Sequence, residues 1–227
     1  MSKLARTLAL DQVDIEIKIK ILREALKKDL EGLPRNKTRT IKKIERWQKH
    51  LEYISNSLLR ITESLLGTLE KDLECKFPDA ELLHIAMFQP STRNLFMELH
   101  VHFMQSENNP ISKTDFENVI SLSDMSRVLA MIGDSATELA VIHYLWRKRT
   151  ADAGDITQKR AQIISNENMA RLCDRWGLYE KRIHFDPVTA RKSEMEHIKG
   201  TLVEAVYGIV YINEGFDKIV KTVKLLM

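Results

Sequence analysis

The sequence has few of the residues that mark disulfide-bonded, collagen-like or disordered chains. Its 227 residues include only two cysteines, eight glycines and five prolines, and 44% are hydrophobic. Cys75 and Cys173 are far apart and have no neighbours at metal-ligand spacing, which argues against a disulfide scaffold and a zinc module. We therefore expect a reducing compartment, the cytoplasm, and a chain that buries the core of one or two domains.

Long apolar runs and a large net charge are also missing. No apolar stretch approaches the ~20 residues that a transmembrane helix needs, so we expect no membrane partner. Residues 1–11 carry two scattered cations and no sustained apolar stretch, which predicts no signal peptide. The net charge of +3 is too small to indicate a partner, so the local distribution of charge must carry that argument.

The abundance of Leu, Ile, Lys, Glu and Arg predicts an all-α protein. Residues 11–29 favour a helix, although the alternation between Val13 and Ile21 is also compatible with a strand. Apolar residues then recur three or four apart over residues 38–74, in a near-heptad seam that ends before Pro78. We place the one plausible domain boundary at residues 75–78, between a helical N-terminal extension (1–77) and a second domain (78–227).

The second domain is predicted to contain shorter helices and no strand. Thr157 is expected to cap one of them, and Trp146 and Trp176, at helix ends, are expected in the core. The scattered histidines are interpreted as packing or surface residues. The predicted helices cover residues 80–88, 91–104, 115–120, 125–149, 157–176, 194–211 and 216–226.

Two acids stand in apolar helical segments. Asp134 follows Gly133, and Glu204 is the only charged residue between positions 200 and 211. An isolated buried carboxylate is costly unless it is hydrogen-bonded, paired with a cation or bound to a metal ion. Glu138 lies four residues after Asp134 and therefore on the same helix face, although an acid at that spacing is more often solvated or paired.

Five motifs in order resemble the ribonuclease III family, and together they cover residues 78–227. The segment at Gly133-Asp134 is similar to the family's signature helix, and Glu204-Ala205 to its second acidic helix. The other three motifs are residues 82–91, with Gln89 where a histidine is common, residues 154–170, and the closing turn at 211–216. The resemblance implies a homodimer in which each subunit cuts one strand of double-stranded RNA and leaves short 3′ overhangs.

The sequence also departs from the family pattern. Of four acidic positions, two hold Asp134 and Glu204, whereas the other two fall on Ala130 and Thr201, and a further acidic position falls on Arg127. This pattern resembles the Mini-ribonuclease III branch, which lacks a double-stranded RNA-binding domain and often carries a Glu where Glu138 stands. The N-terminal arm is absent from that branch.

The resemblance implies catalysis with Mg²⁺, for which Mn²⁺ can substitute. Hard divalent cations prefer carboxylate and water oxygens, so we expect Asp134 and Glu204 to hold one ion and Glu138 to contribute through water. A second ion would depend on the RNA phosphate, which predicts slower or more metal-demanding cleavage. Two alternatives stay open: a catalytically impaired dimer that binds structured RNA or a ribonucleoprotein, and an interaction module in which residues 38–74 pair with a partner helix.

Binding to RNA would depend on cations, because duplex phosphates dominate affinity. The densest basic run surrounds Trp47 and is opposed only by Glu45. It is either an RNA-binding arm or a solvated helix face over a core that contains Trp47. Lys159, Arg160 and Lys199 lie nearer the two acids, and Lys199 is expected to reach either a phosphate or a salt-bridge partner. The basic run comprises Arg35, Lys37, Arg39, Lys42, Lys43, Arg46 and Lys49.

Overall fold

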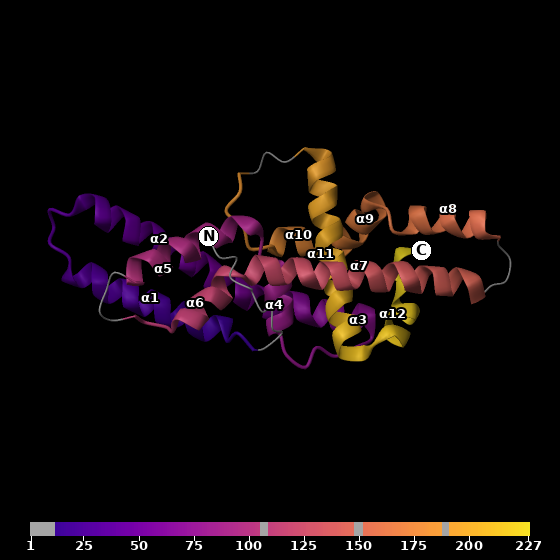
Figure 1. Cartoon of the computed structure of the whole chain (residues 1–227), viewed down its shortest axis with the longest axis horizontal. Helices are drawn as coiled ribbons and strands as arrows, with labels where there is room; N and C mark the ends of the chain where they lie inside the picture. Colours follow the sequence, from indigo (N-terminus) through magenta and orange to yellow (C-terminus); the bar gives the residue numbers. More distant parts are fainter. Residues whose placement is uncertain (1–11, 105–108, 148–151, 188–190) are drawn as a thin grey trace, which may run out of the picture.

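The computed structural model describes residues 12–104, 109–147, 152–187 and 191–227 (Figure 1). The segment in which no signal peptide is predicted lies outside these residues. Over the described ranges the structure is helical without a β-strand, and a single parallel bridge joins Phe88 to Ile183. The all-α prediction is therefore confirmed.

The N-terminal arm is a helical hairpin whose second helix continues beyond it. Helix α1 (Ile15–Gly32) and helix α2 (Thr38–Arg60) pack together, so the segment that was compatible with a strand is helical. Helix α2 runs through one π-helical turn, η1 (Ile61–Leu65), into α3 (Leu66–Leu73). The hairpin is stabilised by apolar side chains that each helix turns toward the other, and the buried ones include Ile19, Leu22, Leu26, Ile44, Trp47, Leu51 and Ile54.

The rest of the chain is built around two long helices, α7 (Leu122–Arg147) and α11 (Lys192–Glu214), which cross near the middle of the molecule (Figure 1). Shorter helices surround this crossing. They are α4 (Glu81–Met87), η2 (Pro90–Thr92), α5 (Arg93–Met104), α6 (Lys113–Ile120), α8 (Ala153–Ile163), α9 (Asn166–Trp176), α10 (Leu178–Lys181), α12 (Phe216–Thr222) and η3 (Val223–Leu226).

The prediction of one helix over residues 157–176 is wrong, because the segment forms two helices, α8 and α9. Ser165 is extended and caps α9, and its hydroxyl accepts a hydrogen bond from the Asn168 N–H at 3.3 Å. The cap of α8 is Asp152, which accepts from the Asp155 N–H at 2.9 Å. Thr157 lies inside α8 and donates its hydroxyl to the Ala153 carbonyl, as hydroxyl side chains do within helices.

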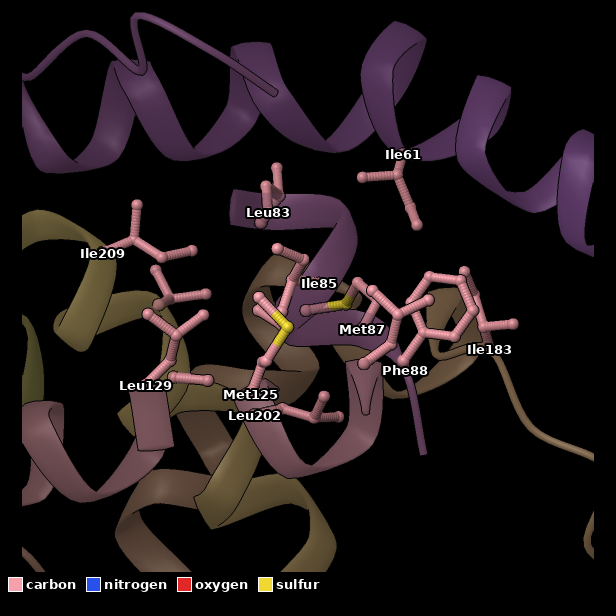
Figure 2. Close-up of a cluster of buried hydrophobic side chains, with 14 of the residues drawn as sticks. Ile61, Leu83, Ile85, Met87, Phe88, Met125, Leu129, Ile183, Leu202 and Ile209 are labelled. Atoms are coloured by element: carbon pink, nitrogen blue, oxygen red, sulfur yellow. The ribbon is translucent and has the colours of Figure 1, made fainter. Parts of the chain in front are cut away.

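One continuous apolar core joins the arm to the second domain. Figure 2 shows Leu83, Ile85 and Met87 of α4 between Ile61 of the arm and Leu129 of α7. The predicted boundary at residues 75–78 stays a prediction, and the arm packs directly on the helices of the second domain.

A buried carboxylate also joins the arm to the second domain. Glu81 accepts hydrogen bonds from the backbone N–H groups of Val13 and Ile15, each at 3.0 Å, at the start of α1. Burial raises the pKa of this carboxyl, while the two N–H donors lower it. Glu81 thereby satisfies the Ile15 amide, which the first turn of α1 leaves without a partner, and the amide of Val13 just before the helix.

Helix α7 is the one helix among the described residues that is long and apolar enough to cross a membrane. Its residues Leu122–Trp146 have the length and hydropathy of a membrane span, and 39% of that window is buried. In this fold α7 is a core helix that packs on α4, α11 and α12.

The thiols of Cys75 and Cys173 are free and buried. Burial raises the pKa of Cys173 to about 12, so Cys173 is an unreactive packing residue.

Candidate active site

Two glycines bring the backbones of α7 and α11 into direct contact. A Cβ atom added to Gly133 would lie 1.8 Å from the carbonyl oxygen of Glu204, and one added to Gly208 would lie 2.0 Å from that of Leu129. Only glycine leaves room for such an approach. The crossing therefore places Asp134, which follows Gly133, beside Glu204, which stands one helical turn before Gly208.

The two carboxylates share an electrostatic environment that disfavours negative charge. Burial, with a smaller contribution from the neighbouring Asp134 carboxylate, raises the pKa of Glu204 to about 7. The pKa of Asp134 is also raised, first by burial and then by the Glu138 carboxylate. Asp134 is open to solvent and Glu204 is half-buried. Within the described ranges neither carboxylate has an ion pair or a side-chain hydrogen bond, so their charge is uncompensated by the protein.

This arrangement fits a hard divalent cation, because a cation would remove the repulsion that raises both pKa values. The part of the chain that the structure describes holds no group of three His, Cys, Asp or Glu side chains arranged for a metal ion. Water and substrate oxygens would therefore complete the coordination of an ion on Asp134 and Glu204.

The residues at the positions that depart from the four-acid pattern differ in their surroundings. Ala130 is 5% exposed, and Thr201 donates its hydroxyl to the His197 carbonyl at 3.0 Å. Arg127 is exposed, and its Nη1 lies 3.8 Å from Asp124 Oδ1 on the same helix. Among the recorded ion pairs, Arg127 makes none with the two acids, so the structure offers no cation in place of a metal there.

Four further candidate residues lie on α7, α8 and α11. Glu138 accepts a hydrogen bond from Arg160 Nη1 of α8, and Arg160 Nε is buried without a hydrogen-bond partner. Lys199 Nζ lies 2.6 Å from Asp174 Oδ1, which raises the pKa of the lysine and corresponds to the salt-bridge alternative. Lys159 is exposed on α8 and has no recorded ion pair.

In the basic run of the arm, two cations contact other side chains and the rest have no recorded ion pair. Trp47 is buried and donates its indole N–H to Glu98 Oε2 at 2.7 Å, and Arg46 Nη2 pairs with the same oxygen at 2.5 Å. Lys43 Nζ stands 4.8 Å from the centroid of the Trp47 ring. The remaining cations are exposed and have no recorded ion pair, and they are Arg35, Lys37, Arg39, Lys42 and Lys49.

An exposed apolar face on α7 was not identified from the sequence. Met131 is 69% exposed and Leu139 56%, and they border a hollow of about 540 Å³ that Tyr211 and Phe216 also line. Trp146 continues this face at 68% exposure, so its predicted place in the core is wrong, whereas Trp176 is buried as expected. The sequence signal for this face is the recurrence of apolar residues three or four positions apart between Val128 and Leu139.

Residues 127–215, from the second turn of α7 to the residue after α11, match the family described as Ribonuclease III domain. This part of the chain is similar to a ribonuclease III domain. The ribonuclease III resemblance of the sequence motifs is thereby confirmed, and the crossing of α7 and α11 lies inside the matched region.

Curated relatives carry the same family name. The chain is similar to Ribonuclease 3 of Clostridium acetobutylicum (26% identity over 158 residues, 68% of this chain and 58% of the relative). It is also similar to Ribonuclease 3 of Pelotomaculum thermopropionicum (29% over 116 residues, 47% of this chain and 45% of the relative). A third relative is Ribonuclease 3 of Campylobacter jejuni subsp. doylei (26% over 161 residues, 69% of this chain and 58% of the relative). The chain spans about half the length of the curated relatives it matches.

Proposed function

We propose that this protein is a metal-dependent endoribonuclease that hydrolyses phosphodiesters in double-stranded or structured RNA, in RNA processing. The observation that carries the proposal is the pair Asp134 and Glu204, which a glycine-dependent helix crossing brings together, without protein partners, inside a ribonuclease III domain. Cutting of a labelled RNA duplex in Mg²⁺, and its absence when EDTA removes the metal, tests this function.

Asp134 and Glu204 would hold the metal ion, which would be Mg²⁺ or, as a substitute, Mn²⁺. A divalent ion at this position supplies a more acidic water and stabilises negative charge on the leaving oxygen. Asp134 is the more exposed of the two acids and is accessible to an RNA phosphate. Glu138 is held by Arg160 and would act on Asp134 through its charge and through water.

The raised pKa of Glu204 predicts a pH-dependent metal affinity. A protonated carboxyl must lose its proton to bind a cation, so the apparent Mg²⁺ affinity should rise about tenfold per pH unit below pH 7 and level off above it. Titration of Mg²⁺ into the protein by calorimetry at pH 5.5, 6.5 and 8.0 measures this. Affinity that is the same at all three pH values would contradict a linkage to Glu204.

The same shift makes an opposite prediction for the stability of the metal-free protein. The folded pKa of about 7 lies above the ordinary value of 4.5, so the folded state binds the proton more tightly. The stabilisation is fully present below about pH 4.5 and is lost as the pH rises through 7. Urea unfolding in EDTA across this range should show the loss, and Glu204→Gln should remove that part of the pH dependence.

We further propose that a second copy of the chain covers the apolar face of α7. The face combines a protruding side chain, Met131, with a hollow beside it, which is an arrangement that a two-fold axis can pair with itself. It also flanks Asp134, so a dimer would place two pairs of acids on one assembly, as cutting both strands of a duplex requires.

Met131→Glu should convert the dimer to monomer, because it places a charge in an apolar interface. Light scattering after size-exclusion chromatography measures the mass of each species. Leu59→Glu is the control, because Leu59 is 54% exposed on α2 of the arm, which is outside this face. A dimer that survives Met131→Glu, or a wild-type monomer at micromolar concentration, would contradict the proposed interface.

Ala130 and Thr201 favour the second candidate function, a ribonuclease III-like dimer that binds structured RNA or a ribonucleoprotein without cutting it. Neither residue offers a carboxylate to a second metal ion. Binding of an RNA duplex without cleavage in Mg²⁺ or Mn²⁺ would support this function over the first.

A further inference from the structure

We propose that the tip of the α1–α2 hairpin is a second binding site, for the phosphate backbone of duplex RNA, separate from the acidic pair. The inference rests on the proposed function only in taking structured RNA as the substrate. The tip comprises the end of α1, the connecting loop and the start of α2, and its exposed cations are Lys27, Lys28, Arg35, Lys37, Arg39 and Lys42.

The tip has a large excess of positive charge, and most of its cations have no ion-pair partner among the described residues. Residues 27–49 contain nine Lys and Arg against three Asp and Glu. One of the acids, Asp29, is already paired, with His102 Nε2 at 2.8 Å. The cations of the loop and of the first turns of α2 have no recorded ion pair. A surface with this excess attracts polyanions at long range.

The side chains around the cations favour a phosphate backbone as the binding partner. Protein partners generally bury an apolar core, yet none of the large exposed hydrophobic residues of the described chain falls within residues 27–49. Proteins that bind single strands stack bases on exposed aromatic rings, whereas Trp47, the only aromatic residue in this range, is buried. Cations without stacking platforms suit a double helix, whose bases stay paired and whose affinity comes from phosphates.

The hairpin is held to the second domain at several points, so its tip lies at a fixed distance from the acidic pair. Glu98 of α5 accepts from both Arg46 and Trp47 of α2. Lys18 of α1 pairs with Asp115 of α6 at 2.7 Å, and both side chains are largely enclosed. In Figure 1 the hairpin tip lies at one end of the molecule, and the α7–α11 crossing lies near its middle. A long duplex can therefore contact both sites at once, while a short one reaches only one.

The test measures binding, not cleavage. The triple variant Lys37→Gln/Arg39→Gln/Lys42→Gln in the full chain is compared with wild type by fluorescence anisotropy, in EDTA, on duplexes of roughly 30 and roughly 10 base pairs. We expect a loss of about tenfold or more on the long duplex and little change on the short one. The slope of log Kd against log salt should fall by about 2 to 3, because each lost phosphate contact contributes about 0.9.

The control is a triple variant with the same change in net charge, Lys71→Gln/Lys221→Gln/Lys224→Gln. These lysines are exposed on α3, α12 and η3, away from the hairpin, and have no recorded ion pair. The control should bind both duplexes as wild type does. Circular dichroism of both variants should match wild type, because every substituted side chain is exposed.

Equal losses in the two triple variants, an unchanged affinity in the arm variant, or a wild type that does not bind the long duplex would each overturn the hairpin site. The result is independent of catalysis. A wild type that binds but does not cut, with a binding loss confined to the arm variant, supports the hairpin site and refutes the nuclease. If the wild type cuts the duplex and the arm variant binds it normally, the nuclease is supported and the hairpin site is refuted.

Discussion

Asp134→Asn and Glu204→Gln should each lower cleavage of an RNA duplex by at least about 10³-fold in Mg²⁺. This corresponds to about 4 kcal/mol of activation free energy, the order that a catalytic metal ion supplies. Each substitution keeps the shape of the side chain and removes one of the two carboxylates that are proposed to hold the ion. The proposed metal site has only these two protein ligands, so each loss should be close to complete.

Glu138→Gln provides the matched comparison on the same helix. Its carboxylate is engaged with Arg160, and its influence on Asp134 is through charge, so we expect a loss of about tenfold and not 10³-fold. Single-turnover cleavage of an end-labelled duplex measures all three variants. Because burial of negative charge is unfavourable at the site, Glu204→Gln should be at least as stable as wild type at pH 8. Substantial cutting by either Asp134→Asn or Glu204→Gln would contradict the two-acid site.

Gly133→Ala and Gly208→Ala should each destabilise the fold by about 3 kcal/mol or more and abolish cleavage. The added methyl groups would lie 1.8 Å and 2.0 Å from backbone carbonyl oxygens, which cannot rotate away as side-chain atoms do. The two long helices would have to separate, and Asp134 and Glu204 would separate with them. Thermal unfolding should shift down by roughly 6 to 12 °C for a chain of this size.

Gly67→Ala is the control for these two variants. Gly67 is exposed in α3, and a Cβ atom added there meets nothing within 4 Å. Alanine should stabilise this helix by about 0.5 to 1 kcal/mol, because it restricts the unfolded chain. If Gly133→Ala unfolds at the temperature of wild type or above it, as Gly67→Ala should, the glycine contact does not determine the crossing.

The sequence predicts the helices and the acidic pair well because both depend on local patterns. Apolar spacings of three and four identify α2 and its continuation through η1 and α3, and the rarity of glycine and proline favours helices throughout. Asp134 and Glu204 are recognisable because a lone charge in an apolar helix is costly and needs a reason. The order of the motifs then indicates the family that the match over residues 127–215 confirms.

The features that the sequence does not predict depend on partners that are distant along the chain. The engagement of Glu138 by Arg160, and of Arg46 and Trp47 by Glu98, depends on how α7 meets α8 and how α2 meets α5. Likewise Trp146, at the end of an apolar helix, is exposed because no other described helix covers that face of α7.

The break between α8 and α9 was missed for a local reason. Ser165 competes as an N-cap against the continuous helical spacing around it, and the cap prevails.

The most direct test of the two-acid nuclease is the fate of a perfect RNA duplex labelled on both strands and incubated with the wild-type protein in Mg²⁺ and then in Mn²⁺. We predict cleavage of both strands with short 3′ overhangs in either metal ion, and none in EDTA. A duplex that is bound and yet stays intact with both metal ions would contradict the account and leave a ribonuclease III domain that holds RNA without cutting it.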